Sequence, residues 1–109
     1  MPFILELFSG TGSVGKVAKE MGYSVVSLDR DMKASIQIDI MDWDYTDLKP
    51  KLFDVVWASP PCRDIEGSNE VVKRTLDILE YFQPKYWIIE NPPKWAIKRS
   101  TFYVGNTIQ

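Results

Sequence analysis

Apolar residues in this chain occur in short runs separated by polar turns. Runs that are almost continuously apolar are typical of strands buried on both faces of a parallel sheet, and a short alternating run fits a minor strand. The runs predict five strands, at residues 3–8, 24–28, 36–38, 53–57 and 86–89. The stretch 43–50 is polar and predicts a turn or one helical turn.

Two segments between these runs repeat apolar residues at helical spacing. The first ends at Gly22, a residue that suits a helix C-cap. The second begins after Ser68, a suitable N-cap, and ends before Pro84. The apolar residues expected on the packed faces are Val14, Val17, Ala18 and Met21 in the first helix, and Val71, Val72, Leu76, Leu79 and Phe82 in the second.

Strands that alternate with helices predict an α/β protein. We expect a Rossmann-like, open and mostly parallel sheet of about five strands, with helices on both faces. A single domain should span residues 1–109, with no separate target-recognition domain and with the tail 94–109 unassigned because it shows no clear period. Ligands of such sheets bind beyond the carboxyl ends of the strands, so functional residues should lie at strand ends.

Composition excludes several classes of protein. The chain has 109 residues, is 45% hydrophobic and 26% charged, and contains no apolar stretch long enough for a membrane span. No leader-like segment is expected at its start. A single cysteine cannot form an internal disulfide, which suits the cytoplasm, or the interior of a host cell if the source is viral. The absence of histidine excludes Ser-His-Asp and Cys-His catalysis and most zinc sites, so no metal is expected.

The net charge of −2 and the isoelectric point near 5.1 bear on possible partners. A protein that binds nucleic acid by itself usually carries a basic footprint that neutralises phosphates. The nearest approach here is the trio Lys94, Lys98 and Arg99, which we interpret mainly as a solvated face. A nucleic-acid partner would therefore need additional protein surface.

A glycine-rich turn follows the first predicted strand. Gly10, Gly12 and Gly15 form the pattern G-x-G-x-x-G between a strand and a helix, and Asp29 ends the next strand about 20 residues later. The first two glycines allow a tight turn and a close approach of the backbone to a ligand, and the third allows close helix–strand packing. This context favours a nucleoside-bearing cofactor whose ribose hydroxyls donate to Asp29.

Three acids near successive strand ends indicate which cofactor this is. Glu6 fits poorly beside the pyrophosphate of a dinucleotide, but well beside a cation. Asp39 follows the third predicted strand and is suited to accept from an adenine amino group. With Asp29, these acids favour S-adenosylmethionine, which carries a sulphonium, an amino group and no phosphate.

The only cysteine, Cys62, follows the fourth predicted strand in the segment ASPPC. Two prolines end the strand, so the thiol is displayed on a stiff turn, although a lone cysteine is more often a small buried apolar residue. Glu90 ends the fifth predicted strand. A thiolate that adds to carbon 6 of cytosine makes carbon 5 nucleophilic, and a carboxylic acid at the ring nitrogen stabilises the charge that develops. Arg63 is a candidate for lowering the thiol pKa.

The segments ELFSGTGSVG, SLDRD, IDI, ASPPC and IENPP carry a resemblance that covers residues 3 to about 93. They resemble, in order and spacing, the DNA (cytosine-5)-methyltransferases, and more closely the small methyltransferase-like proteins of phages and large viruses. The resemblance implies Cys62 as the nucleophile and Glu90 as the acid. It implies that the cofactor contacts Phe8, Ser9, Gly10 and Gly12, Asp29 at the ribose, Asp39 and Ile40 at the adenine, and Pro60. We add Glu6, Thr11, Arg30 and Ser59 to these expected contacts.

The sequence departs from this family's pattern at several points. Arg63 stands where Gln is usual and Pro92 where Val is usual, and only residues 63–67 separate Cys62 from the expected helix cap. The family's long closing loop, its arginine-rich strand and its DNA-reading domain are absent. Whether the chain turns over alone is therefore left open.

Three functions are consistent with these patterns. The first is a DNA cytosine-5 methyltransferase, or its cofactor-binding portion, acting in DNA methylation such as restriction–modification. The second is a catalytically inactive, nucleotide-binding regulatory module. The third, an exocyclic-amine methyltransferase, is disfavoured because Ser59-Pro60-Pro61 is followed by cysteine and not by an aromatic residue. DNA is the expected partner. A homo-oligomer is possible if the aromatic residues outside the predicted elements are exposed and not in the core: Trp43, Trp95, Phe102 and Tyr103.

Overall fold

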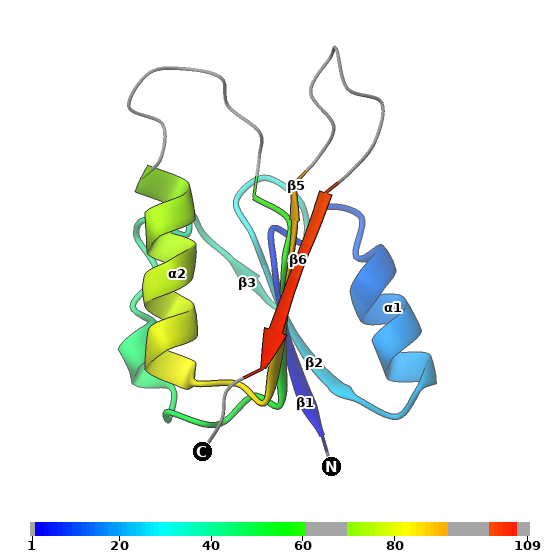
Figure 1. The fold of residues 1–109 in the computed structure, drawn as a ribbon. Helices are drawn as coiled ribbons and strands as arrows, with labels where there is room; N and C mark the ends of the chain where they lie inside the picture. The colour runs from blue at the N-terminus through cyan, green and yellow to red at the C-terminus, as the bar shows by residue number, and fades with distance from the viewer. Residues whose placement is uncertain (1, 61–69, 92–100, 107–109) are drawn as a thin grey trace.

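A computed structural model describes residues 2–60, 70–91 and 101–106, and contains one six-stranded sheet (Figure 1). The strand order is β3-β2-β1-β4-β5-β6. Strands β1 to β5 run parallel to one another, and β6 runs antiparallel to β5. The strands are β1 (Phe3–Leu7), β2 (Ser24–Asp29), β3 (Ile36–Gln37), β4 (Val55–Ala58), β5 (Tyr86–Asn91) and β6 (Thr101–Asn106).

The two α-helices lie on opposite faces of this sheet (Figure 1). Helix α1 (Ser13–Glu20) connects β1 to β2, and α2 (Glu70–Phe82) lies between β4 and β5 in the chain. The strand order therefore runs outward in both directions from the central pair of β1 and β4. This arrangement confirms the predicted open α/β fold, and a crevice is expected at the carboxyl ends of the central strands, where the order reverses.

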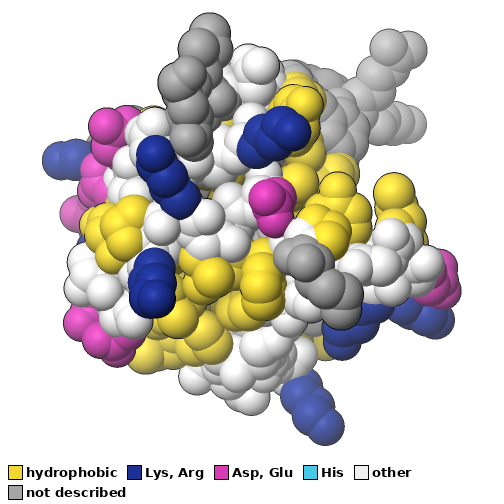
Figure 2. All heavy atoms as spheres, turned by 90° about the horizontal axis from the view of Figure 1, so that it is seen from below, with side chains coloured by type: hydrophobic (Ala, Val, Ile, Leu, Met, Phe, Trp, Pro, Cys, Tyr) yellow, Lys and Arg dark blue, Asp and Glu magenta, His cyan; other side chains and the backbone are white. Residues whose placement is uncertain are grey.

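The end of the sheet where the parallel strands begin is seen in Figure 2. Apolar side chains lie in the middle of this end, and Lys and Arg side chains are spaced around them with Asp and Glu among them. Charges of both signs are mixed here, so this end offers no continuous basic surface for phosphates. In the described ranges, no helix combines the length and the apolar character that crossing a bilayer requires.

The core lies on the α2 side of the sheet. It contains residues of β1, β2, β4, β5 and α2 together with the segment after β3: Leu5, Leu7, Leu28, Ile40, Trp43, Phe53, Val56, Ala58, Ile78, Leu79, Phe82 and Ile89. The Phe82 ring meets Phe53 edge-on at 5.0 Å between centroids and stacks on Trp43 at 6.3 Å. Trp43 is therefore core and not an exposed contact residue, whereas Tyr103 is half exposed. Trp95 lies outside the described residues, and the side chain of Phe102 is not described.

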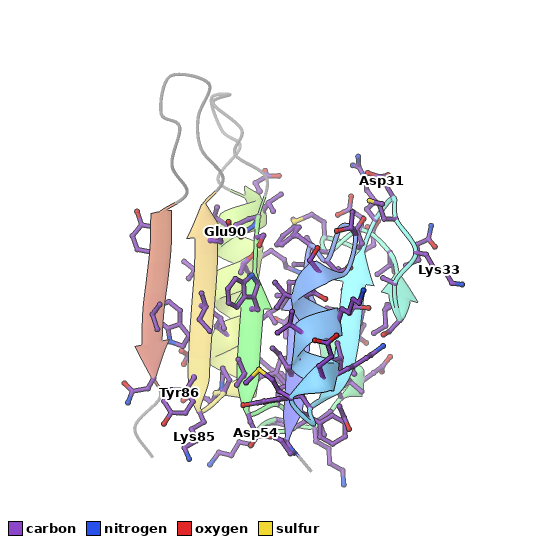
Figure 3. All side chains as sticks on the ribbon, turned by 90° about the vertical axis from the view of Figure 1, so that its right-hand side faces the viewer. Asp31, Lys33, Asp54, Lys85, Tyr86 and Glu90 are labelled. Atoms are coloured by element: carbon purple, nitrogen blue, oxygen red, sulfur yellow. The ribbon has the colours of Figure 1, made fainter. Side chains whose placement is uncertain are left out.

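The helix faces predicted from apolar spacing were partly wrong. In α1, Gly15 and Ala18 are buried, whereas Val17 and Met21 are exposed. Helix α1 lies over β1 and β2 only, so the same face of β4, β5 and β6 has no described helix over it (Figure 3). Helix α1 approaches the sheet closely because Gly15 has no side chain. A Cβ added to Gly15 would lie 2.7 Å from Glu6 Oε1. In α2, Val72 and Leu76 are exposed, and Thr75 and Ile78 are buried in their place.

The sheet has one strand more than the sequence predicted. Strand β6 lies in the tail that showed no clear period, and it pairs with β5 from Tyr86↔Asn106 to Asn91↔Thr101. The pattern was hidden because Gly105 occupies a position that faces the same side as Trp87. The Trp87 ring fills the space where a side chain at position 105 would be, since an added Cβ would collide with that ring. The strand therefore obtains its packing from its neighbour.

Candidate cofactor cavity and active site

The glycine turn begins directly after β1 and is held in an uncommon backbone conformation. Phe8, Gly10 and Gly12 have φ values of 59°, 54° and 80°, in the left-handed region that suits glycine but strains a phenylalanine. The Ser9 N–H donates to the Leu28 carbonyl at 3.0 Å and anchors the turn to β2. The expected tight turn at Gly10 and Gly12 is confirmed, and the strain at Phe8 was not predicted.

Asp29 fastens the turn to the end of β2. Its Oδ2 accepts from the Gly10 N–H at 2.8 Å, and its Oδ1 accepts from the N–H groups of Asp31 and Met32, both at 2.9 Å. Burial alone would raise the pKa of Asp29, but hydrogen bonds from the backbone of Met32, Gly10 and Asp31 outweigh burial, and the pKa lies below its ordinary value. Since each carboxylate oxygen has two lone pairs, Oδ2 can accept one more hydrogen bond.

Glu6 lies beneath the first turn of α1 and not in open solvent. It is 3% exposed, and burial raises its pKa, although hydrogen bonds from the backbone of Gly15 and Val14 act in the opposite direction. The N-cap of α1, Gly12, has no side chain to cap the helix. A carboxylate beneath this helix terminus is placed favourably with respect to the helix dipole.

Two buried polar atoms at this end of β1 have no hydrogen-bond partner among the described residues. They are Glu6 Oε1 and Ser9 Oγ. Leaving a buried polar atom unpaired costs about 1–3 kcal/mol, and such atoms occur where a ligand or water supplies the missing partner. The turn thus has unused hydrogen-bonding capacity.

A cavity of about 410 Å³ lies beyond the carboxyl ends of the strands. Four acidic side chains and one basic side chain are among the residues that line it: Phe8, Leu28, Asp29, Arg30, Asp31, Asp39, Ile40, Met41, Ser59, Glu70 and Val71. This volume is within the range of small-molecule sites, and the excess of carboxylates makes the local potential negative. The cavity therefore favours a ligand with a positive charge.

Six of the twelve expected cofactor residues line this cavity, and six do not. The six that line it are Phe8, Asp29, Arg30, Asp39, Ile40 and Ser59. Of the other six, four belong to the turn and one lies beneath it: Ser9, Gly10, Thr11 and Gly12, and Glu6. The sixth, Pro60, follows Ser59 after β4, and its side chain is fully buried. Sequence reasoning missed Glu70 and Val71, because no local pattern shows that the first turn of α2 reaches the ends of β2 and β3. Asp31 also lines the cavity, although it is not among the twelve expected contacts.

Helix α2 holds the part of the cavity wall that follows β3. The Arg74 guanidinium donates to the carbonyl oxygens of Ile40, at 3.1 Å, and Trp43, at 2.6 Å. The same guanidinium lies over the Tyr45 ring at 4.8 Å from its centroid. The Tyr81 hydroxyl donates to the Leu48 carbonyl at 2.6 Å. These contacts fix the irregular segment that carries Asp39 and Ile40.

On the other side of the crevice, the register of β4 and β5 brings Ser59 beside Glu90. Trp57 pairs with Ile88 and Ala58 with Ile89, so the next positions are Ser59 and Glu90. The Ser59 hydroxyl donates to Glu90 Oε1 at 3.1 Å, and the Trp57 indole N–H donates to Ser59 Oγ at 3.2 Å. Figure 3 shows Glu90 at the upper end of β5. Cys62 and Arg63 lie outside the described residues, so their predicted roles stay predictions.

One curated protein resembles the chain along most of its length. A frog virus 3 (isolate Goorha) protein named "Probable DNA (cytosine-5)-methyltransferase" is 40% identical over 120 residues, covering 87% of this chain and 56% of the relative. The chain thus spans about half the length of that relative. Because the aligned stretch is longer than the chain itself, the relative contains insertions within it. No family model matches the chain.

Solved structures share the fold at low sequence identity. An Escherichia coli prophage protein described as a DNA modification methyltransferase superposes with a TM-score of 0.69 at 20% identity, over 85% of this chain and 32% of that protein. The Dnmt2 methyltransferase of Schizosaccharomyces pombe superposes with a TM-score of 0.63 at 19% identity, over 85% of this chain and 34% of that protein. The described sheet and helices therefore match part of larger methyltransferase structures.

Proposed function

Because the chain belongs to the DNA (cytosine-5)-methyltransferase family, we propose that its cavity binds S-adenosylmethionine and that Cys62 and Glu90 act on cytosine in DNA. Family membership rests on a relative of which the chain covers 56%, so the reaction and the substrate are part of the proposal. One observation carries it: Ser59 lines the acidic cavity and also donates a hydrogen bond to Glu90. The cofactor cavity and the proposed acid therefore adjoin.

The charge of the cavity supports this cofactor over a dinucleotide. Asp29, Asp31, Asp39 and Glu70 line it, against the single base Arg30. Like charges in a partly dry crevice repel, so a pyrophosphate would be bound poorly. S-adenosylmethionine, when bound, supplies an electrophilic methyl group on a positively charged sulphur.

The two ends of the cofactor have different candidate partners. For the adenosine, Asp29 Oδ2 retains one acceptor position for a ribose hydroxyl, and Asp39 and Ile40 border the expected adenine position. For the amino-acid end, the unpaired Glu6 Oε1 and Ser9 Oγ supply an acceptor and a hydroxyl at the base of the glycine turn. Glu6 does not line the cavity, so its role as a partner of the ammonium group is proposed from its unpaired oxygen alone.

The proposed chemistry uses the thiol and the acid in sequence. The Cys62 thiolate adds to carbon 6 of the base while Glu90 gives a proton to the ring nitrogen, which leaves carbon 5 electron-rich. Carbon 5 takes the methyl group, and the sulphonium becomes a neutral thioether. Loss of the carbon 5 proton to a solvent base, expulsion of the thiolate and return of the ring-nitrogen proton to the Glu90 carboxylate then release neutral 5-methylcytosine.

DNA contact is proposed to need further protein surface. The net charge of −2 gives no overall attraction to phosphates, and the amino end of the sheet carries charges of both signs (Figure 2). Flipping a base out of a duplex costs unstacking free energy, which contacts with the protein must offset. This chain has little surface to make those contacts. A second polypeptide or a second copy of the chain would provide that surface.

A calorimetric titration tests the cofactor. We expect heat and a raised Tm with S-adenosylmethionine and with its demethylated product, and weaker binding of a nicotinamide dinucleotide. The chemistry is tested with single-stranded and duplex DNA in which 5-fluorocytosine replaces cytosine, because fluorine at carbon 5 cannot leave as a proton and the adduct persists. Cys62→Ser should form no adduct.

The two measurements separate the candidate functions. No heat at millimolar cofactor would contradict the proposed cavity ligand. Cofactor binding without any adduct would favour the second candidate, an inactive module that keeps the nucleotide-binding fold. This second candidate is favoured by the departures from the family's pattern, with Arg63 where Gln is usual and Pro92 where Val is usual.

A further inference from the structure

Beyond the residues assigned so far, we infer that Ser59 and Trp57 are positioning residues that determine which oxygen of Glu90 carries its proton. This inference rests on the proposed function, because it concerns Glu90 as the acid. It starts from two hydrogen bonds in series, from the Trp57 indole N–H to Ser59 Oγ at 3.2 Å and from the Ser59 hydroxyl to Glu90 Oε1 at 3.1 Å.

The direction of this series follows from what each group can donate. The Trp57 indole nitrogen is a donor only, so Ser59 Oγ must be the acceptor in the first bond. The serine hydroxyl has a single proton, and its other neighbour in the series is Glu90 Oε1. The hydroxyl therefore donates to Oε1, which must present a lone pair. When Glu90 is protonated, its proton is left on Oε2.

Without the indole N–H, both acceptor lone pairs of the serine hydroxyl are open, and the opposite polarity becomes more favourable. Glu90 could then donate its proton from Oε1 to Ser59 Oγ, because a hydroxyl oxygen accepts as readily as it donates. An acid whose proton is bonded to serine cannot give it to a base. Trp57 disfavours this arrangement by occupying one of the two acceptor lone pairs of Ser59 Oγ.

The placement of the three residues suits a rigid support. Trp57, Ser59 and Glu90 lie on one face of adjacent strands, and the Ser59 N–H also donates to the Leu7 carbonyl at 3.3 Å, which ties the end of β4 to β1. Ser59 and Glu90 are half-buried, and Trp57 does not line the cavity. Hence the indole acts on Glu90 through serine and is separate from the cofactor contacts.

The test compares hydroxyl and indole variants in the rate at which 5-fluorocytosine DNA is trapped with cofactor present. We expect Ser59→Ala to slow trapping about tenfold and Trp57→Phe about threefold, the range expected for losing one hydrogen bond between uncharged groups. Ser59→Thr, which keeps the hydroxyl, should restore most of the rate. Trp57→Phe should leave cofactor affinity unchanged.

A matched control removes a hydroxyl elsewhere on the same face of the sheet. Ser27 on β2 bonds to Ser35 through its Oγ, at 3.1 Å from the Ser35 hydroxyl, and Ser27→Ala should trap DNA at the wild-type rate. A spectroscopic readout independent of activity is the indole N–H resonance of Trp57, assigned by its loss in Trp57→Phe. It should shift in Ser59→Ala and in Glu90→Gln, and not in Ser27→Ala.

The outcomes separate this inference from the proposed function. If wild type and Ser27→Ala trap DNA, Glu90→Gln does not, and both Ser59→Ala and Trp57→Phe match wild type, the positioning role is overturned while the function stands. An indole resonance that does not shift in Ser59→Ala would also overturn the positioning role. If cofactor-bound wild type traps no DNA, the proposed chemistry fails, and the positioning role fails with it.

Discussion

At the ends of β1 and β2, Asp29 is held by three backbone N–H groups, whereas at the end of β5 the described partner of Glu90 is one serine hydroxyl. The first arrangement fixes a carboxylate in its charged form and makes it part of the turn. The second leaves one carboxyl oxygen for other use. The proposed cofactor half of the crevice is thus held by main-chain hydrogen bonds, and the proposed chemical half by hydrogen bonds between side chains.

The largest expected effect is on the chemical half alone. Glu90→Gln should slow trapping of 5-fluorocytosine DNA on the order of 10³-fold, because general-acid assistance is typically of this size. Cofactor affinity, measured by calorimetry, should stay within about twofold, as the side chain does not line the cavity. Glu80→Gln on the exposed side of α2 serves as the control. Equal losses of trapping and cofactor affinity would show that the two halves are not separable.

The next effect belongs to the cofactor half. Asp29→Ala removes the acceptor of three N–H groups, and we expect a loss of about 2–3 kcal/mol in the free energy of unfolding together with loss of cofactor binding. Denaturant unfolding and calorimetry measure the two. Asp77→Ala is the matched control, because Asp77 is exposed on α2 and does not line the cavity. Unchanged stability in Asp29→Ala would contradict the proposed anchoring of the turn.

A smaller effect on stability should follow from adding a side chain where α1 contacts the sheet. A Cβ on Gly15 would lie 2.7 Å from Glu6 Oε1 and 3.1 Å from Val25 Cγ1, so in Gly15→Ala either the Glu6 carboxylate must move or α1 must lift from the sheet. We expect a net loss of about 1–2 kcal/mol, because overpacking outweighs the better helix propensity of alanine. Lys16→Ala at the next, exposed position controls for propensity. A Tm equal to wild type would mean that the helix is not held by this contact.

The smallest effect is a difference in titration between Glu6 and Asp29. The folded pKa of Asp29 lies below its ordinary 3.8, so its contribution to stability is complete above pH 3.8 and is lost as pH falls through the folded pKa. The folded pKa of Glu6 lies above its ordinary 4.5, so the fold loses stability as pH rises from 4.5 through the folded pKa. NMR titration should show the Gly10 amide changing below pH 3.8 and the Gly15 amide above pH 4.5. A common midpoint would remove the distinction.

Much of the main-chain half was predictable, because its signals are local. Gly10 and Gly12 needed positive φ, and the acid at the next strand end stood at the expected distance. The role of Glu6 as a cofactor contact stays a prediction, and its position beneath α1 depends on how closely Gly15 packs, which the motif letters do not specify. The strain at Phe8 depends on the path between two strands and has no local pattern.

The side-chain half was harder to predict because its contacts depend on the register between distant strands. Ser59 was selected as a cofactor neighbour, but its bond to Glu90 follows from the pairing of Trp57 with Ile88, which fixes positions 31 residues apart. The exposed Leu76 and the buried Thr75 show the same limit, since helical spacing alone does not give the direction of the packed face. Strand β6 was missed because glycine replaces an inward side chain.

Arg74 connects α2 to the cavity wall that follows β3. Its guanidinium donates hydrogen bonds to the carbonyl oxygens of Ile40 and Trp43, and the same helix supplies Glu70 and Val71 to the cavity lining. Because these bonds tie the segment after β3 to the helix, we expect the two to shift together. A ligand that enters on this side should then displace the helix along with the segment and not the segment alone.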